Sequence, residues 1–240
     1  MKFSIVVPAF NEEQLLPATL ARIHAATRAF AGAHDWELIV CDNNSTDRTA
    51  EIAHGAGARV VFEPVNQIGR ARNRGAAAAA GDWLVFVDAD SQPSPGLFGD
   101  MLRAVERGDC LAGGSTIAAA SVAPAFRFGI RAWNALSRLN RWAAGSFMFC
   151  DAAAFRELAG FSDELYASEE LELFRRLKRV ARARRQRIVI LHRHPLATSD
   201  RKLRLYGWRE HAAFFGRMLL RPRRTLRSAA ACRIWYDGRR

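Results

Sequence analysis

Two aspartates, Asp88 and Asp90, stand one residue apart directly after the apolar run WLVFV at 83–87. Asp is disfavoured in strands, and an ionised carboxylate near a sheet interior needs a partner that offsets its desolvation. Along an extended chain, both side chains would point to the same side. Paired carboxylates with open coordination positions suit Mg²⁺ or Mn²⁺ bridging a diphosphate. On spacing alone, the competing interpretation is a polar strand exit in which Ser91 acts as a cap.

Four short runs rich in β-branched and aromatic residues must position these carboxylates. Each run is separated from the next by a segment of helical character. Strands that alternate with crossover helices, and that are almost continuously apolar, predict a parallel sheet covered on both faces. The expected strands are 3–7, 37–41, 58–62 and 83–87, and the expected helices are 12–31, 45–57, with Ser45 or Thr46 as N-cap, and 69–82.

Polar residues gather where three of these strands end. Turns favour Asn, Asp and Ser in any case, so one such turn would carry little weight. Ligands of open parallel sheets bind at the carboxyl ends of the strands, so three polar turns at one edge predict a binding site. The turns hold Pro8, Phe10, Asn11 and Glu12; Asp42, Asn43, Asn44, Ser45, Thr46 and Asp47; and Asp88, Ala89 and Asp90.

The pattern after Pro95 is less regular. It indicates a helix at 96–108, a strand at 110–120, a Trp-, Arg- and Ala-rich segment at 121–144, a helix within 162–181, a strand at 187–195 and an amphipathic helix at 200–220. No segment reaches the roughly twenty apolar residues that a bilayer span needs. We therefore expect one domain over 1–200 and a basic amphipathic extension over 201–240.

The positive charge lies near the end of the chain. Residues 1–174 carry 15 Lys and Arg against 21 Asp and Glu, whereas residues 175–240 carry 21 against 3. Such a tail favours a polyanionic partner, and a solvated basic face without a partner is the alternative. The arginines lack an ordered nucleic-acid recognition motif, so we expect no nucleic acid. Tryptophans among arginines suit an anionic membrane surface instead, namely Trp133, Trp142, Trp208 and Trp235.

The start of the chain and its cysteines bear on its compartment. The opening MKFSIVVPAFNEE has a five-residue apolar run before a proline, which is too short for a secretory signal, so we expect a cytoplasmic protein. The four cysteines are far apart without CxxC spacing, so neither a zinc site nor a disulfide framework is expected.

Four motifs in order resemble family 2 glycosyltransferases with the GT-A fold. They are SIVVPAFNEE, VCDNNSTDRTAEIA, GRARNRGAAAAAGDWLVFVDADS and SEELELFRRLKR, and the resemblance covers most of residues 3–180. It implies a Rossmann-like, mostly parallel central sheet with helices on both faces. It also implies a nucleotide-binding half at 1–117 and an acceptor half at 118–200.

The resemblance assigns roles to the acidic residues. Asp88 and Asp90 would hold Mn²⁺ or Mg²⁺ on the donor diphosphate, Asp90 usually as the direct ligand. Glu170 aligns with the usual base, which would take the proton of the acceptor hydroxyl, although the family usually has Asp there. Whether Glu170 or Glu169 is the base therefore stays open. The alternative is that these glutamates complement a helix dipole and pair with Arg175, Arg176 or Lys178.

The resemblance also places a nucleotide pocket. Pro8, Ala9 and Phe10 would line the base and ribose, Glu12 could accept from a ribose hydroxyl, and Asp42 from a base imide, as in uracil or guanine. For Asn43, Asn44 and Ser45, turn-making is at least as good an interpretation as ligand contact. Arg70 would approach the nucleotide or its phosphates, with Ala89 between the metal-binding aspartates. His192 and His194 would contact the diphosphate or belong to an ordinary strand.

Together these expectations describe an inverting glycosyltransferase that uses a UDP- or GDP-sugar, a divalent metal and a hydroxyl acceptor, with a lipid-linked acceptor as one option. The alternative is a non-catalytic binding protein of the same fold that its basic tail recruits to anionic membrane at the inner face of the cell membrane. Retention of Asp88, Asp90 and an acidic pair argues against that alternative, whereas the Glu at position 170 keeps it open.

Overall fold

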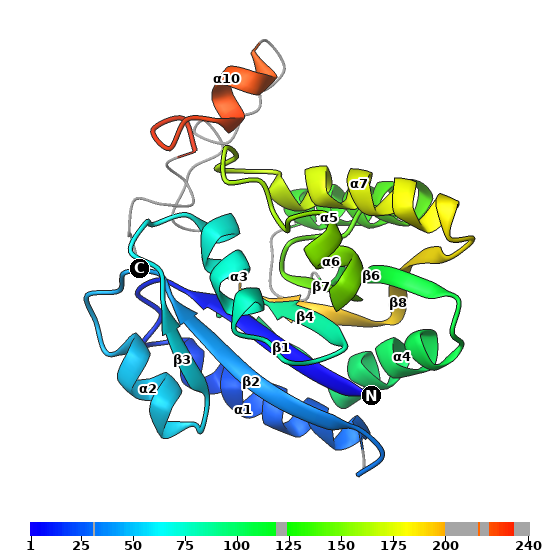
Figure 1. Cartoon of the computed structure of the whole chain (residues 1–240). Helices are drawn as coiled ribbons and strands as arrows, with labels where there is room; N and C mark the ends of the chain where they lie inside the picture. Colours follow the sequence, from blue (N-terminus) through cyan, green and yellow to red (C-terminus); the bar gives the residue numbers. More distant parts are fainter. Residues whose placement is uncertain (31, 119–123, 200–215, 217–220, 233–240) are drawn as a thin grey trace.

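A single eight-stranded sheet runs through the computed structural model, which describes residues 1–30, 32–118, 124–199, 216 and 221–232 (Figure 1). The strand order is β3-β2-β1-β4-β7-β6-β8-β5. The strands are β1 (Lys2–Ala9), β2 (Asp35–Asp42), β3 (Arg59–Phe62), β4 (Trp83–Val87), β5 (Ser91–Gln92), β6 (Cys110–Ile117), β7 (Phe147–Asp151) and β8 (Arg187–Thr198).

The pairing is mostly parallel in the first half of the chain. β1 pairs in parallel with β2 and β4, and β2 with β3. β7 is antiparallel to β4 and β6, whereas β6 and β8 are parallel. The carboxyl ends of β1, β2 and β4 therefore meet at one edge, as expected from the polar turns. The predicted mixed α/β class with a mostly parallel sheet is confirmed.

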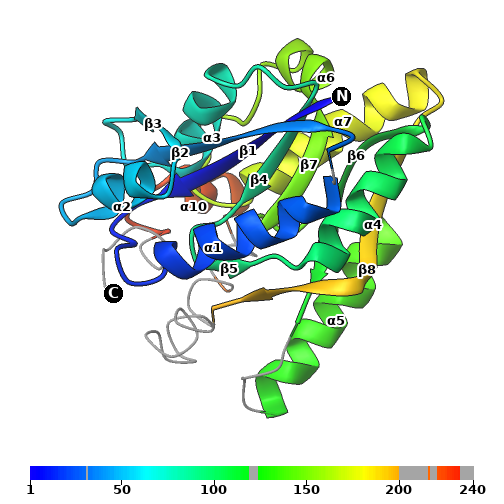
Figure 2. The same cartoon turned by 90° about the horizontal axis from the view of Figure 1, so that it is seen from below.

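Helices cover both faces of the sheet (Figures 1 and 2). One face carries α1, α2 and α4, and the other carries α3, α6 and α7. The helices are α1 (Leu16–Ala26), α2 (Thr49–Gly55), α3 (Ile68–Ala77), α4 (Pro95–Glu106), α5 (Pro124–Asn140), α6 (Ala152–Glu157), α7 (Glu169–Ala183) and α10 (Pro222–Leu226).

Alternation along β1 divides the core between the two faces. Phe3, Ile5 and Val7 belong to the buried cluster under α1 and α4, whereas Val6 belongs to the cluster under α3 and α7. A Cβ at Gly75 would lie 2.4 Å from Val6 Cγ1, so only glycine lets α3 approach β1 this closely. This close approach sets the distance between α3 and the sheet edge.

Two expected helices differ from the structure. The first, expected over 12–31, is α1 from Leu16 to Ala26 followed by a 3₁₀ turn, Thr27–Phe30, because the residues before Leu16 form a loop held by hydrogen bonds. The helix expected at 200–220 falls outside the described residues except for Gly216. The division at residue 200 remains a prediction.

Three further expectations concern membrane-spanning segments, the cysteines and the N-cap of the second helix. No helix among the described residues is long and apolar enough to cross a bilayer. All four cysteines are buried and free. The second helix begins after Arg48 without a side-chain cap, so Ser45 and Thr46 do not cap it; Asp47 accepts from the backbone N–H of Thr49 instead, at 2.9 Å.

Candidate active site

Asp88 and Asp90 lie in a turn at the end of β4. The backbone N–H of Ser91 donates to the carbonyl of Asp88 at 3.0 Å, which closes the turn. The argument that an extended chain sends both aspartates to one side is therefore wrong, because the chain is no longer extended after Val87. The hydroxyl of Thr19 on α1 donates to the carbonyl of Ala89 at 2.7 Å and connects the turn to this helix.

Arg72 on α3 joins the two acidic motifs. Its guanidinium donates to Asp88 Oδ1 at 2.9 Å, to Glu169 Oε1 at 2.6 Å and to the carbonyl of Gly145 at 3.0 Å. The side chain is 1% exposed and Glu169 is 4% exposed, so water screens this pair little. A planar guanidinium presents five donors in a rigid fork, so it can hold two carboxylates and a carbonyl in a fixed geometry.

The electrostatics follow from this burial. Burial alone would lower the pKa of Arg72, but Asp88, Glu169 and Glu170 raise it above its usual value, so the guanidinium stays charged. The ring of Phe161 lies 5.4 Å from the guanidinium carbon and covers its face. One buried cation thus offsets a cluster of three carboxylates.

Glu170 is the third carboxylate of this cluster, and its surroundings raise its pKa. A Cβ at Gly145 would lie 3.7 Å from the Glu170 carboxyl carbon and 3.0 Å from Arg72 Nη2, so Gly145 lies between the two side chains. Burial and the neighbouring Glu169 raise the pKa of Glu170 to about 8, and Arg72 only partly opposes this shift. A carboxylate with a raised pKa is a stronger base than an exposed one.

The turns after β1 and β2 are held together by reciprocal hydrogen bonds. The N–H of Asn11 donates to Ser45 Oγ at 3.0 Å, and the N–H of Thr46 donates to Asn11 Oδ1 at 2.8 Å. The N–H of Glu12 donates to Thr49 Oγ1 at 2.8 Å. Pro8 and Ala9 of β1 pair with Cys41 and Asp42 of β2, so the predicted nucleotide residues converge at this edge.

Two asparagines that follow β2, Asn43 and Asn44, have structural roles in this turn. Asn43 donates to the carbonyls of Glu63 and Val65 and accepts from the N–H of Gln67, so it joins this turn to the start of α3. Asn44 has a φ of 67°, in the left-handed region that asparagine tolerates. Turn-making, one of the two interpretations of these residues, is what the structure shows for Asn43.

Arg70 and the two histidines are placed away from the paired aspartates. Arg70 lies 3.4 Å from Glu63 and 3.8 Å from Asp163, at the rim of the nucleotide-side turns. His194 Nδ1 is 2.9 Å from Asp100 Oδ2 of α4, and His192 contacts the carbonyl of Ile190. The ordinary-strand interpretation therefore describes both histidines.

Sequence reasoning did not identify Arg72 as a site residue, because its partners lie far along the chain. It did not identify Asn73 and Gln67 either. Asn73 exchanges hydrogen bonds with the backbone of Phe161, and Gln67 donates to the carbonyls of Asp163 and Leu165. These contacts hold the loop that leads into α7, and a polar residue on the inner face of a helix was their only local signal.

A divalent metal fits the residues at this edge when a diphosphate is bound. The described residues contain no group of three or more His, Cys, Asp and Glu that could hold a metal alone. Mg²⁺ and Mn²⁺ at such sites are commonly bound by one or two carboxylates together with substrate phosphates, and Asp88 and Asp90 offer two. Both are only half-buried, which leaves them open to a ligand.

The structural neighbours share this fold. A mannosyltransferase from Pyrobaculum calidifontis in complex with GDP-Man and Mn²⁺ superimposes with a TM-score of 0.68 and 17% identity over 96% of this chain and 64% of that chain. Glucosyl-3-phosphoglycerate synthase from Mycobacterium tuberculosis, in complex with Mn²⁺, UDP and phosphoglyceric acid, has a TM-score of 0.62 and 22% identity over 96% of this chain and 78% of that chain.

Sequence relatives point the same way. An uncharacterised glycosyltransferase of Mycobacterium tuberculosis is 38% identical over 105 residues, 44% of each chain. A dolichol-phosphate mannosyltransferase of Pyrococcus furiosus is 31% identical over 123 residues, 48% of this chain and 33% of that enzyme. The chain thus matches less than half the length of these relatives. Residues 4–158 match the family described as Glycosyl transferase family 2, and the chain belongs to this family.

Proposed function

We propose that this chain catalyses inverting transfer of a sugar from a UDP- or GDP-linked donor to a hydroxyl acceptor, with Mn²⁺ or Mg²⁺. The observation that carries the proposal is the bridge from Arg72 to Asp88 and Glu169, because it brings the diphosphate side and the acidic pair of α7 into one site.

Glu170 is the general base in this proposal. Glu169 is engaged by Arg72 at 2.6 Å, so its lone pairs are partly occupied and its charge is offset. Glu170 has the raised pKa and the glycine beside it. It takes the proton of the acceptor hydroxyl while that oxygen forms a bond to the anomeric carbon, and the bond from this carbon to the diphosphate oxygen breaks.

Asp88 and Asp90 would hold the metal, which neutralises charge on the departing diphosphate. Arg72 keeps Asp88 oriented by occupying one of its oxygens. On the nucleotide side, Pro8, Ala9, Phe10, Glu12, Asp42 and Asn44 would receive the base and ribose, and Arg70 would stand at the rim. Neighbours whose complexes contain UDP or GDP-Man support a uridine or guanosine diphosphate without choosing between them.

Thermal stability tests the donor site directly. Among UDP, GDP, dTDP, CMP and ADP, we expect UDP or GDP to raise the melting temperature of the wild type most with Mn²⁺ but not without it, and not to do so for Asp90→Ala. A ligand at about 100 times its dissociation constant adds ~2.7 kcal/mol, which is easily seen. The control is Asp35→Ala, an exposed aspartate of β2. A nucleotide that stabilises Asp90→Ala as well as wild type would contradict the metal assignment.

We further propose that the enzyme meets its acceptor at an anionic membrane surface. The support comes from α5, where Phe128, Leu136 and Leu139 are 76%, 49% and 81% exposed. Residues 110–150 contain no Asp or Glu, and the arginines near these side chains are Arg127, Arg131, Arg138 and Arg141. Exposed apolar side chains among arginines suit the headgroup region of an anionic bilayer. The same surface would serve the non-catalytic alternative, which loss of transfer in Glu170→Gln would exclude.

A further inference from the structure

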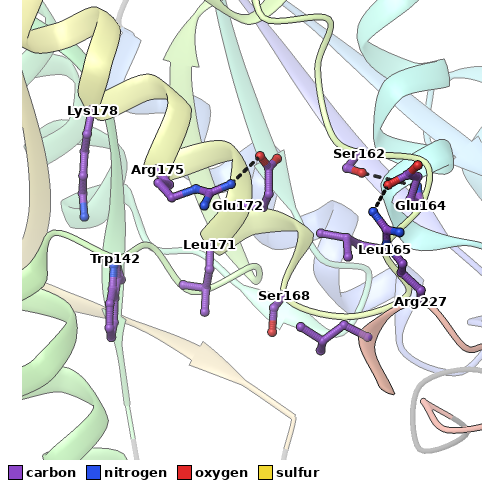
Figure 3. A pocket seen from close by; sticks show the side chains of 11 residues that line it. Trp142, Ser162, Glu164, Leu165, Ser168, Leu171, Glu172, Arg175, Lys178 and Arg227 are labelled. Atoms are coloured by element: carbon purple, nitrogen blue, oxygen red, sulfur yellow. Dashed lines mark hydrogen bonds and ion pairs between the residues drawn. The ribbon is translucent and has the colours of Figure 1, made fainter. Parts of the chain in front are cut away.

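A cavity of about 770 Å³ lies on the outer side of α7 (Figure 3). Its walls come from one face of α7, from the turn after α5, from the loop before α7 and from the short segment that follows α10. This volume is in the range of small-molecule sites. Ser168, Leu171, Arg175 and Lys178 recur at helical spacing along α7, so the helix presents one continuous wall.

The charged groups of this cavity leave a net positive field. Glu172 pairs with Arg176 at 2.6 Å and with Arg175 at 3.5 Å, and Glu164 pairs with Arg227 at 2.5 Å, so both carboxylates are already paired. Lys178 donates to the carbonyl of Asn140 at 2.5 Å, and it pairs with no carboxylate among the described residues. Burial lowers the pKa of Lys178 most, and the neighbouring cations Arg182 and Arg141 lower it further. An anion placed there would relieve this repulsion.

The remaining walls are apolar. Figure 3 shows Trp142 facing Lys178 across the cavity mouth, with Leu171 and Leu165 along its length. The ammonium of Lys178 lies 5.8 Å from the centroid of the Trp142 ring. Leu226 also lines the cavity. A ligand that fills this space therefore has an anionic group near Lys178 and an apolar body along the leucines.

The cavity shares its walls with the reaction site. Ser168 immediately precedes Glu169 and Glu170, and Trp142 belongs to the turn that ends at Gly145, whose carbonyl accepts from Arg72. A molecule in the cavity thus contacts the two segments that hold the acidic pair.

Building on the proposed function, we infer that this cavity binds the acceptor, and that the acceptor carries a phosphate-class anion next to an apolar body. Lys178 and Arg175 receive the anion, Trp142, Leu171 and Leu165 receive the body, and the reacting hydroxyl reaches Glu170 past Ser168. The anion is that of a lipid-borne phosphate, and the probes below test the anionic group and the apolar body separately.

Isothermal titration of the full chain with octyl phosphate, inorganic phosphate and octanol tests the inference. We expect octyl phosphate to bind and Lys178→Gln to weaken this binding about tenfold or more, as for a lost hydrogen bond to a charged group. The matched control is Arg179→Gln, which removes the same charge from an exposed neighbour on α7 outside the cavity lining, and should change affinity by less than about twofold.

Each outcome has one meaning. Octyl phosphate binding more tightly than both other probes supports a lipid-borne phosphate. If inorganic phosphate binds as tightly as octyl phosphate, the inferred apolar body of the acceptor is wrong. If octanol binds as tightly as octyl phosphate, the inferred anion is wrong. No binding, or the same loss in Arg179→Gln as in Lys178→Gln, would overturn it entirely. Nucleotide stabilisation with Mn²⁺ should be unchanged in Lys178→Gln, so failure of the donor site and failure of this inference remain distinguishable.

Discussion

At the scale of single residues, the site depends on one arginine. Arg72 pairs with Asp88 and Glu169, which lie 16 and 97 residues away in sequence. Breaking a buried ion pair by removing one partner costs more than the pair contributes, because the remaining charges lose their only compensation. The consequence is that Arg72 positions both acidic motifs and stabilises the fold at the same time.

The first prediction concerns this arginine. Arg72→Ala should lower the free energy of unfolding by about 3–5 kcal/mol, because it leaves buried carboxylates unpaired. Arg72→Lys should lower the free energy of unfolding by less, since lysine keeps the positive charge but lacks the planar fork of N–H donors. Urea unfolding measures both, with Arg74→Ala, an exposed arginine of the same helix, as the control. A stability of Arg72→Ala within about 1 kcal/mol of wild type would contradict the structural role given to this residue.

The second prediction concerns Glu170. Glu170→Gln should keep nucleotide binding and lose about 10²–10⁴-fold of transfer, the usual contribution of a general base. In the wild type, transfer should rise with pH up to the pKa of Glu170, raised to about 8, because only the ionised carboxylate accepts a proton. Glu157→Gln, an exposed glutamate of α6, is the control. Full activity in Glu170→Gln would move the base to another residue.

At the scale of elements, α4 and β8 are joined by a polar contact of His194, for which the sequence left open a diphosphate contact or an ordinary strand. A Cβ at Gly96 would lie 2.5 Å from the His194 ring, so glycine lets this ring lie against α4. Its Nδ1 then reaches Asp100, whose side chain is 6% exposed. Burial alone would raise the pKa of Asp100, but hydrogen bonds from His194 and Arg103 hold it below its usual value.

The third prediction follows from this contact. A carboxylate with a lowered pKa contributes stability above its unfolded pKa, and this contribution is lost as pH falls through its folded pKa. Asp100→Asn should therefore destabilise the protein by about 1–3 kcal/mol near neutral pH and by less in acid. Urea unfolding at a series of pH values measures this difference. Asp109→Asn, in a surface pair with Arg187, should change stability by less than about 1 kcal/mol.

At the scale of the whole molecule, the surface of α5 differs from the rest. Three of the large hydrophobic side chains exposed among the described residues lie on this one helix, and Trp142 of the cavity follows its end. Deleting residues 221–240 would test the basic tail less cleanly, because Thr225 and Cys232 are buried and Leu226 accepts from the N–H of Tyr166. Substitutions on α5 leave that packing intact.

The fourth prediction concerns membrane contact. The double variant Phe128→Ser with Leu139→Ser should bind vesicles of phosphatidylglycerol and phosphatidylcholine about tenfold more weakly or worse, because full burial of such a side chain is worth ~1.5–3 kcal/mol. Vesicle sedimentation measures this affinity. The control, Phe62→Ser with Val65→Ser, removes exposed side chains beside β3. Equal vesicle binding by all three proteins, or binding without dependence on anionic lipid, would contradict a contact through α5.

The sequence by itself determined the features that depend on neighbours in the chain. Apolar runs and crossover segments predicted β1, β2, β3 and β4 and the edge at which the polar turns meet, because strand and helix periodicity are local properties. The same local signals placed Asp88, Asp90, Glu169 and Glu170 after a strand or at a helix start. They left open whether the chain stays extended through Asp90 or turns after Val87, because the local pattern allowed both.

Only the tertiary structure decided which of these residues meet. Arg72 lies between Asp88 and Glu169 because β7 inserts antiparallel beside β4 and brings α7 over the sheet edge, and no local pattern encodes that pairing. The same packing engages Glu169, leaves Glu170 with a raised pKa, and turns His194 toward Asp100. Contacts between distant segments arise from the shape of the whole core, so charge partners and cavities follow from the fold rather than from spacing along the chain.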